Sequence, residues 1–210
     1  YVYRTPNTSM DIDIVSFLSS FIEKKEIVNA VEIAGNNGVF ANKLLEKVNL
    51  DNFNITIIDK VELAINNSKV HHVHAFLEES SRDLFSDVSS DLVIVRHAIA
   101  HNTSIRKFFG DIVSILDPDY LYIENASLIS TFNNQDYSQL YSEHYFQMSP
   151  LSIVSVGNDF GYSVLEIKEF DIHNGSFGIL LHKGAKLVEP PVAEISSDAL
   201  RISIEDWASS

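Results

Sequence analysis

The 210-residue sequence contains no cysteine, which excludes disulfide bonds and thiolate metal sites. Basic residues are also few, because 15 Lys and Arg stand against 29 Asp and Glu, giving a net charge of −14. Such a chain repels nucleic-acid phosphates, and no dense basic patch offsets the repulsion. Long apolar runs are missing too, since "LVIV" (92–95) and "FGILL" (177–181) are far shorter than a membrane span. We therefore expect a cytoplasmic protein without nucleic-acid or membrane partners.

The sequence shows no signal peptide and does not begin with Met, so we expect either a domain excised from a longer protein or a trimmed chain. The length suits one α/β domain, and an apolar fraction of 45% suffices for a packed core. The pattern weakens from Lys186 onward, where Pro190 and Pro191 indicate a linker. We therefore place a domain at 1–185 and a linker or tail at 186–210, leading toward a further C-terminal domain.

Stretches with helical spacing alternate with short apolar runs typical of strands. Helices are predicted at 11–24, 40–48, 61–68, 105–116 and 149–161, and strands at 27–35, 54–59, 70–76, 91–98, 120–127, 162–171 and 176–184. Alternating strands and helices predict an α/β fold with a mostly parallel sheet and helices on both faces. The turn "IHNG" predicts a C-terminal antiparallel hairpin. This Rossmann-like layout is that of class I methyltransferases, which use S-adenosylmethionine.

The stretch "VEIAGNNGVF" (31–40) predicts a strand, a tight turn and the start of a helix. Gly35 and Gly38 allow the backbone of this turn to approach a ligand or adopt a positive φ. A dinucleotide-binding turn would instead need G-x-G-x-x-G to hold a pyrophosphate. Glu32 lies three residues before the first glycine, where it would repel a phosphate but suit the cationic methionyl amine of S-adenosylmethionine. We include Asn36 and Asn37 of the same turn in the predicted cofactor site.

Three residues after later strands extend this predicted site. Asp59 ends the second strand, 21 residues past Gly38, where a carboxylate can accept both ribose hydroxyls. Phe76 follows the third strand, near the expected place of the adenine ring, although a core position suits it about as well. His97 follows the fourth strand and is predicted to line the cofactor pocket.

Taken together, these segments resemble the C-methyltransferases that act on nucleotide-linked keto-deoxysugars. "VEIAGNNGVF" is similar to their E-I-x-x-N-D-G stretch, and "RHAIAHN" (96–102) to their R-H-x-x-x-H segment. "YSQLYSEHYFQMSP" (137–150) resembles their Y-x-E-H segment, and "HNGSFGILLH" (173–182) their H-G-G-S strand. The likeness runs in order from residue 1 to about 185, and Y-x-E-H together with H-x-G-S is its specific part.

The sequence also departs from that family. The family's N-terminal zinc module and C-terminal α/β domain have no counterpart in these residues. Asn37 replaces a common Asp, and Asn174 replaces a common Gly. We expect the methyl-transfer core to be kept, with either a different substrate or flanking domains in a parent protein as the explanation.

The resemblance implies roles for residues around Y-x-E-H. His144 would be the base that removes a proton next to a carbonyl, since histidine titrates near neutrality. Glu143 would orient the base or bind substrate, and Tyr141 and His101 would support the enolate oxygen. The resemblance also assigns substrate contacts, which we expect at Tyr1, Tyr3, His173 and Ser176. From pattern alone, Tyr141 and His144 would instead share one face of an amphipathic surface turn.

Other interpretations stay open at this point. His97 and His101 are four residues apart, but H-E-x-x-H is missing, so no metal site is predicted. His71, His72 and His74 are interpreted as edge or surface residues. Transfer to oxygen or nitrogen of a small molecule is the nearest alternative reaction. A second alternative is that the chain is a non-catalytic module of a larger biosynthetic protein. A nicotinamide dehydrogenase is a more distant alternative.

Overall fold

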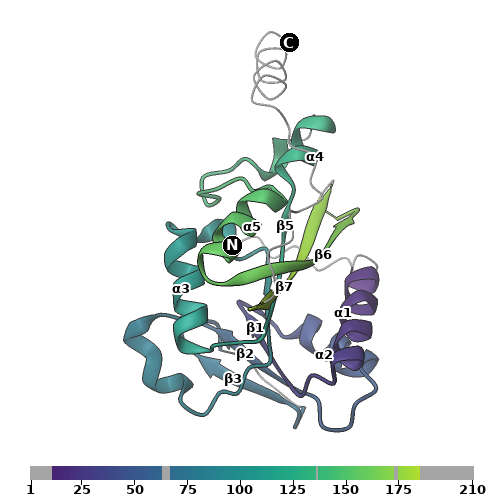
Figure 1. The fold of residues 1–210 in the computed structure, drawn as a ribbon, viewed down its shortest axis with the longest axis vertical. Coiled ribbons are helices and arrows are strands. Elements are labelled where there is room, and N and C mark those ends of the chain that lie inside the picture. Colours follow the sequence, from purple (N-terminus) through teal and green to yellow (C-terminus); the bar gives the residue numbers. More distant parts are fainter. Residues whose placement is uncertain (1–10, 63–66, 136, 173–174, 185–210) are drawn as a thin grey trace.

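The computed structural model describes residues 11–62, 67–135, 137–172 and 175–184. Their centre is a seven-stranded sheet in the order β3-β2-β1-β4-β5-β7-β6 (Figure 1). The strands are β1 (Asn29–Ile33), β2 (Asn54–Asp59), β3 (Val70–His74), β4 (Leu92–Arg96), β5 (Tyr120–Ala126), β6 (Tyr162–Phe170) and β7 (Ser176–Lys183). The first five strands pair in parallel, whereas β7 pairs antiparallel with both β5 and β6. The predicted parallel sheet with a C-terminal hairpin is confirmed.

Helices cover both faces of the sheet, as predicted. They are α1 (Asp11–Lys25), α2 (Val39–Lys47), α3 (Ile105–Ile115), α4 (Leu128–Asn133) and α5 (Pro150–Asp159), with short 3-10 turns η1 (Glu79–Phe85), η2 (Ile99–His101) and η3 (Tyr137–Gln139). Figure 1 shows α1 and α2 on one side of the sheet and α3 and α5 on the other. Two apolar clusters fill the spaces between these layers.

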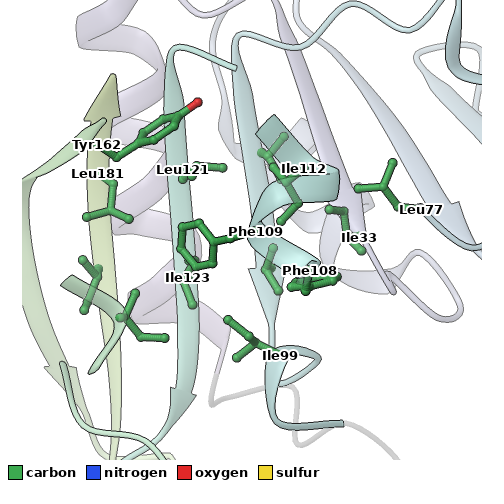
Figure 2. Close-up of a cluster of buried hydrophobic side chains, with 14 of the residues drawn as sticks. Ile33, Leu77, Ile99, Phe108, Phe109, Ile112, Leu121, Ile123, Tyr162 and Leu181 are labelled. Carbon is green, nitrogen blue, oxygen red and sulfur yellow. The ribbon is translucent and has the colours of Figure 1, made fainter. Parts of the chain in front are cut away.

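The central strands supply both clusters by alternation. Val93 and Val95 of β4 belong to the cluster under α3 and α5, whereas Leu92 and Ile94 belong to the cluster under α1 and α2. Successive side chains of a strand point to opposite faces, so a strand covered on both sides has to be apolar throughout. Figure 2 shows the side of α3, where Phe109 lies against β5. Each large side chain buried in this way contributes about 1.5–3 kcal/mol.

Two parts of the predicted layout differ from the structure. The helix predicted at 61–68 is wrong where it is described, because Val61, Glu62 and 67–68 are not helical. The carboxylate of Asp59 instead binds the backbone N–H of Val61 at 2.8 Å, which makes a local turn. The sequence also gave no sign of α4, whose six residues lie in a stretch rich in Ser and Asn. The predicted linker or tail at 186–210 lies outside the described residues.

No helix in the described part of the chain combines the length and apolarity that a membrane crossing requires.

Candidate functional site

A cavity of about 700 Å³ opens at the carboxyl ends of the parallel strands. This is the edge at which open α/β sheets bind their ligands, and the volume is in the range of small-molecule sites. Predicted site residues from four separate segments line it, and these are Asn36, Asp59, Phe76, His97 and His101. The fold therefore brings together side chains up to 65 positions apart in the sequence (36 to 101).

Every second residue of the turn after β1 has a positive φ, including residues other than glycine. Ala34, Asn36 and Gly38 all have positive φ, at 58°, 50° and 69°. Only Gly38 fits the expectation that glycines occupy such positions, and Asn tolerates them better than Ala does. Gly35 serves another purpose, because an added Cβ would lie 2.9 Å from both Oε2 of Glu32 and Cγ2 of Ile57. Its hydrogen side chain lets the turn lie directly on the sheet.

Asp59 fixes this turn to the neighbouring strand. Its Oδ2 accepts a hydrogen bond of 2.8 Å from the backbone N–H of Asn36, and its Oδ1 accepts one from Val61. A carboxylate has about four lone-pair positions, so each oxygen can still accept a hydroxyl. Asp59 therefore holds the turn and can also bind a diol in the cavity.

The carboxyl group of Glu32 is buried behind the turn. Its Oε2 has no hydrogen-bond partner among the residues that the structure describes. Burial raises the pKa of Glu32 to about 8, and although Arg96 opposes this, Asp11 and Asp59 reinforce it. Glu32 does not itself line the cavity, whereas its neighbours Ile33 and Ala34 do. With this pKa the group keeps its proton near neutral pH, and a cation bound beside it would favour the ionised form.

Phe76 and Lys60 form the outer wall of the cavity. The ring of Phe76 is 60% exposed, and Nζ of Lys60 lies 5.3 Å from its centre. Of the two interpretations of Phe76, a core residue is therefore wrong, and a ring open to the cavity is what the structure has. An exposed aromatic ring at the edge of a cavity can stack on a planar ligand group.

The Y-x-E-H segment contacts the loop after β4. The backbone N–H of Tyr145 donates to the carbonyl oxygen of Ala100 at 2.9 Å, and Nδ1 of His101 donates to the carbonyl oxygen of Glu143 at 3.1 Å. The segment is an irregular turn rather than a helix. These two bonds join a segment after β5 to one after β4, near the cavity that His101 lines.

Tyr141 and His144 form a pair within this turn. Oη of Tyr141 lies 2.7 Å from Nε2 of His144, and Nδ1 of His144 lies 2.9 Å from the carbonyl oxygen of Gln139. A carbonyl oxygen only accepts, so Nδ1 carries a proton and Nε2 of the neutral ring accepts from Tyr141. The ring of His101 packs edge-on, with 4.7 Å between the two ring centres. Three of the four predicted catalytic residues therefore lie together.

Burial changes the acid–base properties of this pair. It lowers the pKa of His144, although the bond to Gln139 works in the opposite direction. Burial, aided by the charge of Glu143, raises the pKa of Tyr141. At neutral pH the pair therefore consists of a neutral imidazole with one basic nitrogen and a protonated hydroxyl.

The remaining predicted site residues that the structure describes do not line the cavity. The side chain of Glu143 is exposed, and Asn37 accepts a bond of 3.3 Å from Val39 at the start of α2. The hydroxyl of Ser176 is buried and donates to the carbonyl oxygen of Ile172 at 2.9 Å. The roles predicted for Tyr1, Tyr3 and His173 concern positions outside the described residues.

Sequence reasoning missed a buried charged pair beside the cavity. Arg96 lines the cavity, and its Nε donates to Oε2 of the fully buried Glu124 at 2.8 Å. The two residues are neighbours on β4 and β5. A charged residue in an otherwise apolar strand is the signal that could have found Glu124.

His72 and His74 contact backbone oxygens of the neighbouring strand end. Nε2 of His72 lies 3.3 Å from the carbonyl oxygen of Asp59, and Nε2 of His74 lies 2.7 Å from that of Lys60. Both are on β3, at the edge of the sheet, as predicted. Within the described ranges, no group of three or more His, Asp or Glu side chains is placed to hold a metal ion.

Comparison with known proteins agrees with this architecture. The fold is that of the core domain of class I S-adenosylmethionine-dependent methyltransferases. Among solved structures, an O-methyltransferase family protein from Burkholderia thailandensis has a TM-score of 0.60 at 14% identity, covering 84% of this chain and 57% of that chain. The 1,6-didemethyltoxoflavin-N1-methyltransferase of the same organism, with bound S-adenosylhomocysteine, has a TM-score of 0.61 at 11% identity, covering 85% and 82%.

One curated relative is similar in sequence. The C-methyltransferase NovU of Streptomyces niveus is 26% identical over 110 residues, which are 51% of this chain and 26% of NovU. The match thus spans about a quarter of the length of that relative. No protein-family model matches the sequence.

Proposed function

We propose that this chain binds S-adenosylmethionine in the cavity at the carboxyl ends of β1, β2 and β4. Asp59 would accept the ribose hydroxyls, the ring of Phe76 would stack on adenine, and the carboxyl group of Glu32 would favour the cationic end of the ligand. The unpaired Oε2 of Glu32 is the observation that favours a cation here rather than a pyrophosphate. When bound, S-adenosylmethionine supplies an electrophilic methyl group.

We further propose that the acceptor is a carbon next to a carbonyl group. His144 takes a proton from this carbon at Nε2, and Nδ1 stays bound to Gln139, so the ring keeps its orientation as it becomes charged. In the structure, the hydroxyl of Tyr141 donates a hydrogen bond to Nε2 of His144. When substrate is bound, this hydroxyl turns to the carbonyl oxygen of the substrate. There it donates to the enolate oxygen, and His101, whose Nδ1 donates to Glu143, would join it with Nε2 only as a doubly protonated ring.

The single observation that carries this proposal is the position of the Tyr141–His144 pair. Its loop is bonded to the loop after β4, which borders the cavity, so a base and the cofactor side of the fold are adjacent. Transfer to oxygen needs no carbon acid base. The likeness to NovU supports a nucleotide-linked keto sugar or a similar carbonyl compound as the substrate.

Titration calorimetry with S-adenosylhomocysteine tests the cofactor half of the proposal. The wild-type protein is expected to bind, and Phe76→Ala to weaken binding by about tenfold because a stacked base is lost. Since Phe76 is exposed, this variant should keep its fold. His144→Asn should bind as the wild type does. Failure of the wild type to bind would favour a non-catalytic module.

Methyl transfer to a nucleotide-linked keto-deoxysugar tests the catalytic half. His144→Asn should lose transfer, whereas His71→Asn, a change at an exposed histidine of β3, should keep it. Product with its new methyl group on oxygen or nitrogen would refute the carbon acceptor and support the alternative class.

A further inference from the structure

Glu124 is a fully buried carboxylate with three hydrogen-bond partners, and its shortest contacts are those of Oε2 with Arg96 and of Oε1 with His97. Oε2 accepts from Nε of Arg96 at 2.8 Å and from the hydroxyl of Tyr122 at 3.4 Å. Oε1 lies 2.7 Å from Nε2 of His97. Burial opposes ionisation, but Arg96 and His97 together outweigh it and lower the pKa of Glu124 to about 2. Glu124 is therefore ionised and accepts hydrogen bonds only.

Arg96 is held in place from its other side. Its Nη2 donates to Oδ1 of Asp11 at 2.9 Å, and Nζ of Lys43 binds the second oxygen of Asp11 at 2.7 Å. The guanidinium group also lies over the ring of Phe40, 3.9 Å from its centre. Because α1, α2 and β4 all fix Arg96, its short bond holds Oε2 of Glu124 in place. Oε1 lies at a longer 3.5 Å from Nη2 of Arg96, so its short contact is the one with His97.

His97 needs such a constraint. Its φ is +50°, a left-handed conformation that is strained for a residue other than glycine. Its backbone N–H donates to the carbonyl oxygen of Glu124 at 2.9 Å, in addition to the side-chain contact. Glu124 thus holds both the backbone and the ring of a residue that lines the cavity.

We propose that Glu124 is a positioning residue, whose buried carboxylate fixes the orientation and the tautomer of His97 at the cofactor cavity. The ionised Oε1 beside Nε2 requires a proton on that nitrogen, so in the singly protonated ring Nδ1 is the hydrogen-bond acceptor. This inference rests on the proposed function insofar as it takes S-adenosylmethionine as the ligand of the cavity.

Glu124→Gln tests the proposal because the amide has one accepting end and one donating end, and Arg96 and His97 cannot both face the accepting end. Arg96 can only donate, so the oxygen of the Gln side chain has to face it, and the NH₂ group then faces Nε2 of His97. Nε2 must become an acceptor, and its proton moves to Nδ1. The variant therefore inverts the tautomer of His97 while keeping the size of the side chain.

Two measurements read this out. In ¹⁵N NMR of the imidazole rings, Nε2 of His97 should appear protonated in the wild type and unprotonated in Glu124→Gln. The dissociation constant for S-adenosylhomocysteine should rise by about tenfold. Tyr122→Phe is the matched control, because it removes a longer contact to the same carboxylate and should change neither signal nor affinity. An unchanged tautomer or an unchanged affinity in Glu124→Gln would overturn the proposal.

A second variant tests the proposal if Glu124→Gln does not fold. His97→Asn keeps the left-handed backbone, which Asn adopts more readily than most residues. It should lower the affinity for S-adenosylhomocysteine by about tenfold with little change in melting temperature, and wild-type affinity in this variant would overturn the proposal. If the wild-type protein binds no S-adenosylhomocysteine, the proposed function fails, while the nitrogen signals still decide whether Glu124 sets the tautomer of His97.

Discussion

Glu32 and Gly35 are in such close contact that a methyl group on Gly35 would lie 2.9 Å from Oε2 of Glu32. The buried carboxyl group thus forms the floor on which the turn after β1 lies. The spacing E-x-x-G has a packing reason here, because only glycine leaves room for the acid beneath the turn.

Gly35→Ala should therefore destabilise the protein. Overpacking of this kind costs about 1–3 kcal/mol, and the displaced turn should also weaken binding of S-adenosylhomocysteine. Gly110→Ala is a suitable control, since an added Cβ there would make only ordinary contacts of 3.6 Å with Phe160. Because Gly110 is in α3, its replacement should be neutral or stabilise by up to about 1 kcal/mol. Urea unfolding measures both effects, and equal stabilities of the two variants would contradict this interpretation of Gly35.

Ala34→Gly should have the opposite effect on the same turn. With φ at 58°, Ala34 is strained, and glycine would release about 1–2 kcal/mol while costing about 0.5–1 kcal/mol in chain entropy. The variant should be neutral or slightly more stable than the wild type. Ala30→Gly, in the buried strand β1, should instead lose about 1 kcal/mol or more. A clear loss of stability in Ala34→Gly would show that the turn is not strained at this position.

Glu32 should make the free energy of unfolding depend on pH. Its pKa is about 8 in the folded protein and 4.5 in an unperturbed chain, so between these values the folded state holds a proton that the unfolded state has lost. Stability should therefore fall as the pH rises through this window, by up to about 1.4 kcal/mol per pH unit. Glu32→Gln removes this contribution.

Urea unfolding from about pH 5 to pH 8 compares the two proteins across that window. Glu46→Gln, a change at an exposed position of α2, controls for the loss of one acidic residue. If the wild type and Glu32→Gln show parallel pH dependences, Glu32 is ionised in the folded protein and the account of its burial is wrong.

The sequence predicted those parts of the structure that depend on local pattern. The bounds of β2 at 54–59 are as predicted, because β-branched residues alternate between two buried faces there. Pro150 and Ser149 marked the start of α5, where a capping box is present. The edge of the sheet at which Asp59, Phe76 and His97 meet follows from the parallel order of the strands.

Features that depend on side-chain pairing between strands could not be predicted. Arg96 and Glu124 are 28 residues apart, and only the register of β4 on β5 makes them neighbours. The positive φ of Ala34 and Asn36 was missed because the spacing of the two glycines draws attention to the wrong positions. The turn that joins Tyr141 to His144 is irregular. Its hydrogen bonds to the loop after β4 depend on the tertiary structure, so local pattern could not predict them.

Exchange of solvent deuterium into the carbon next to the carbonyl group tests directly whether His144 removes a proton from carbon. A nucleotide-linked keto-deoxysugar is incubated in D₂O with the protein and S-adenosylhomocysteine, and NMR follows the loss of the carbon-bound proton. We expect exchange by the wild type and by His71→Asn, and a rate at least about 100-fold lower for His144→Asn, because a general base has been removed. Exchange by His144→Asn at the wild-type rate would contradict the assignment of the base. Methyl transfer by the wild type to oxygen or nitrogen, with no exchange at carbon, would contradict carbon methylation itself.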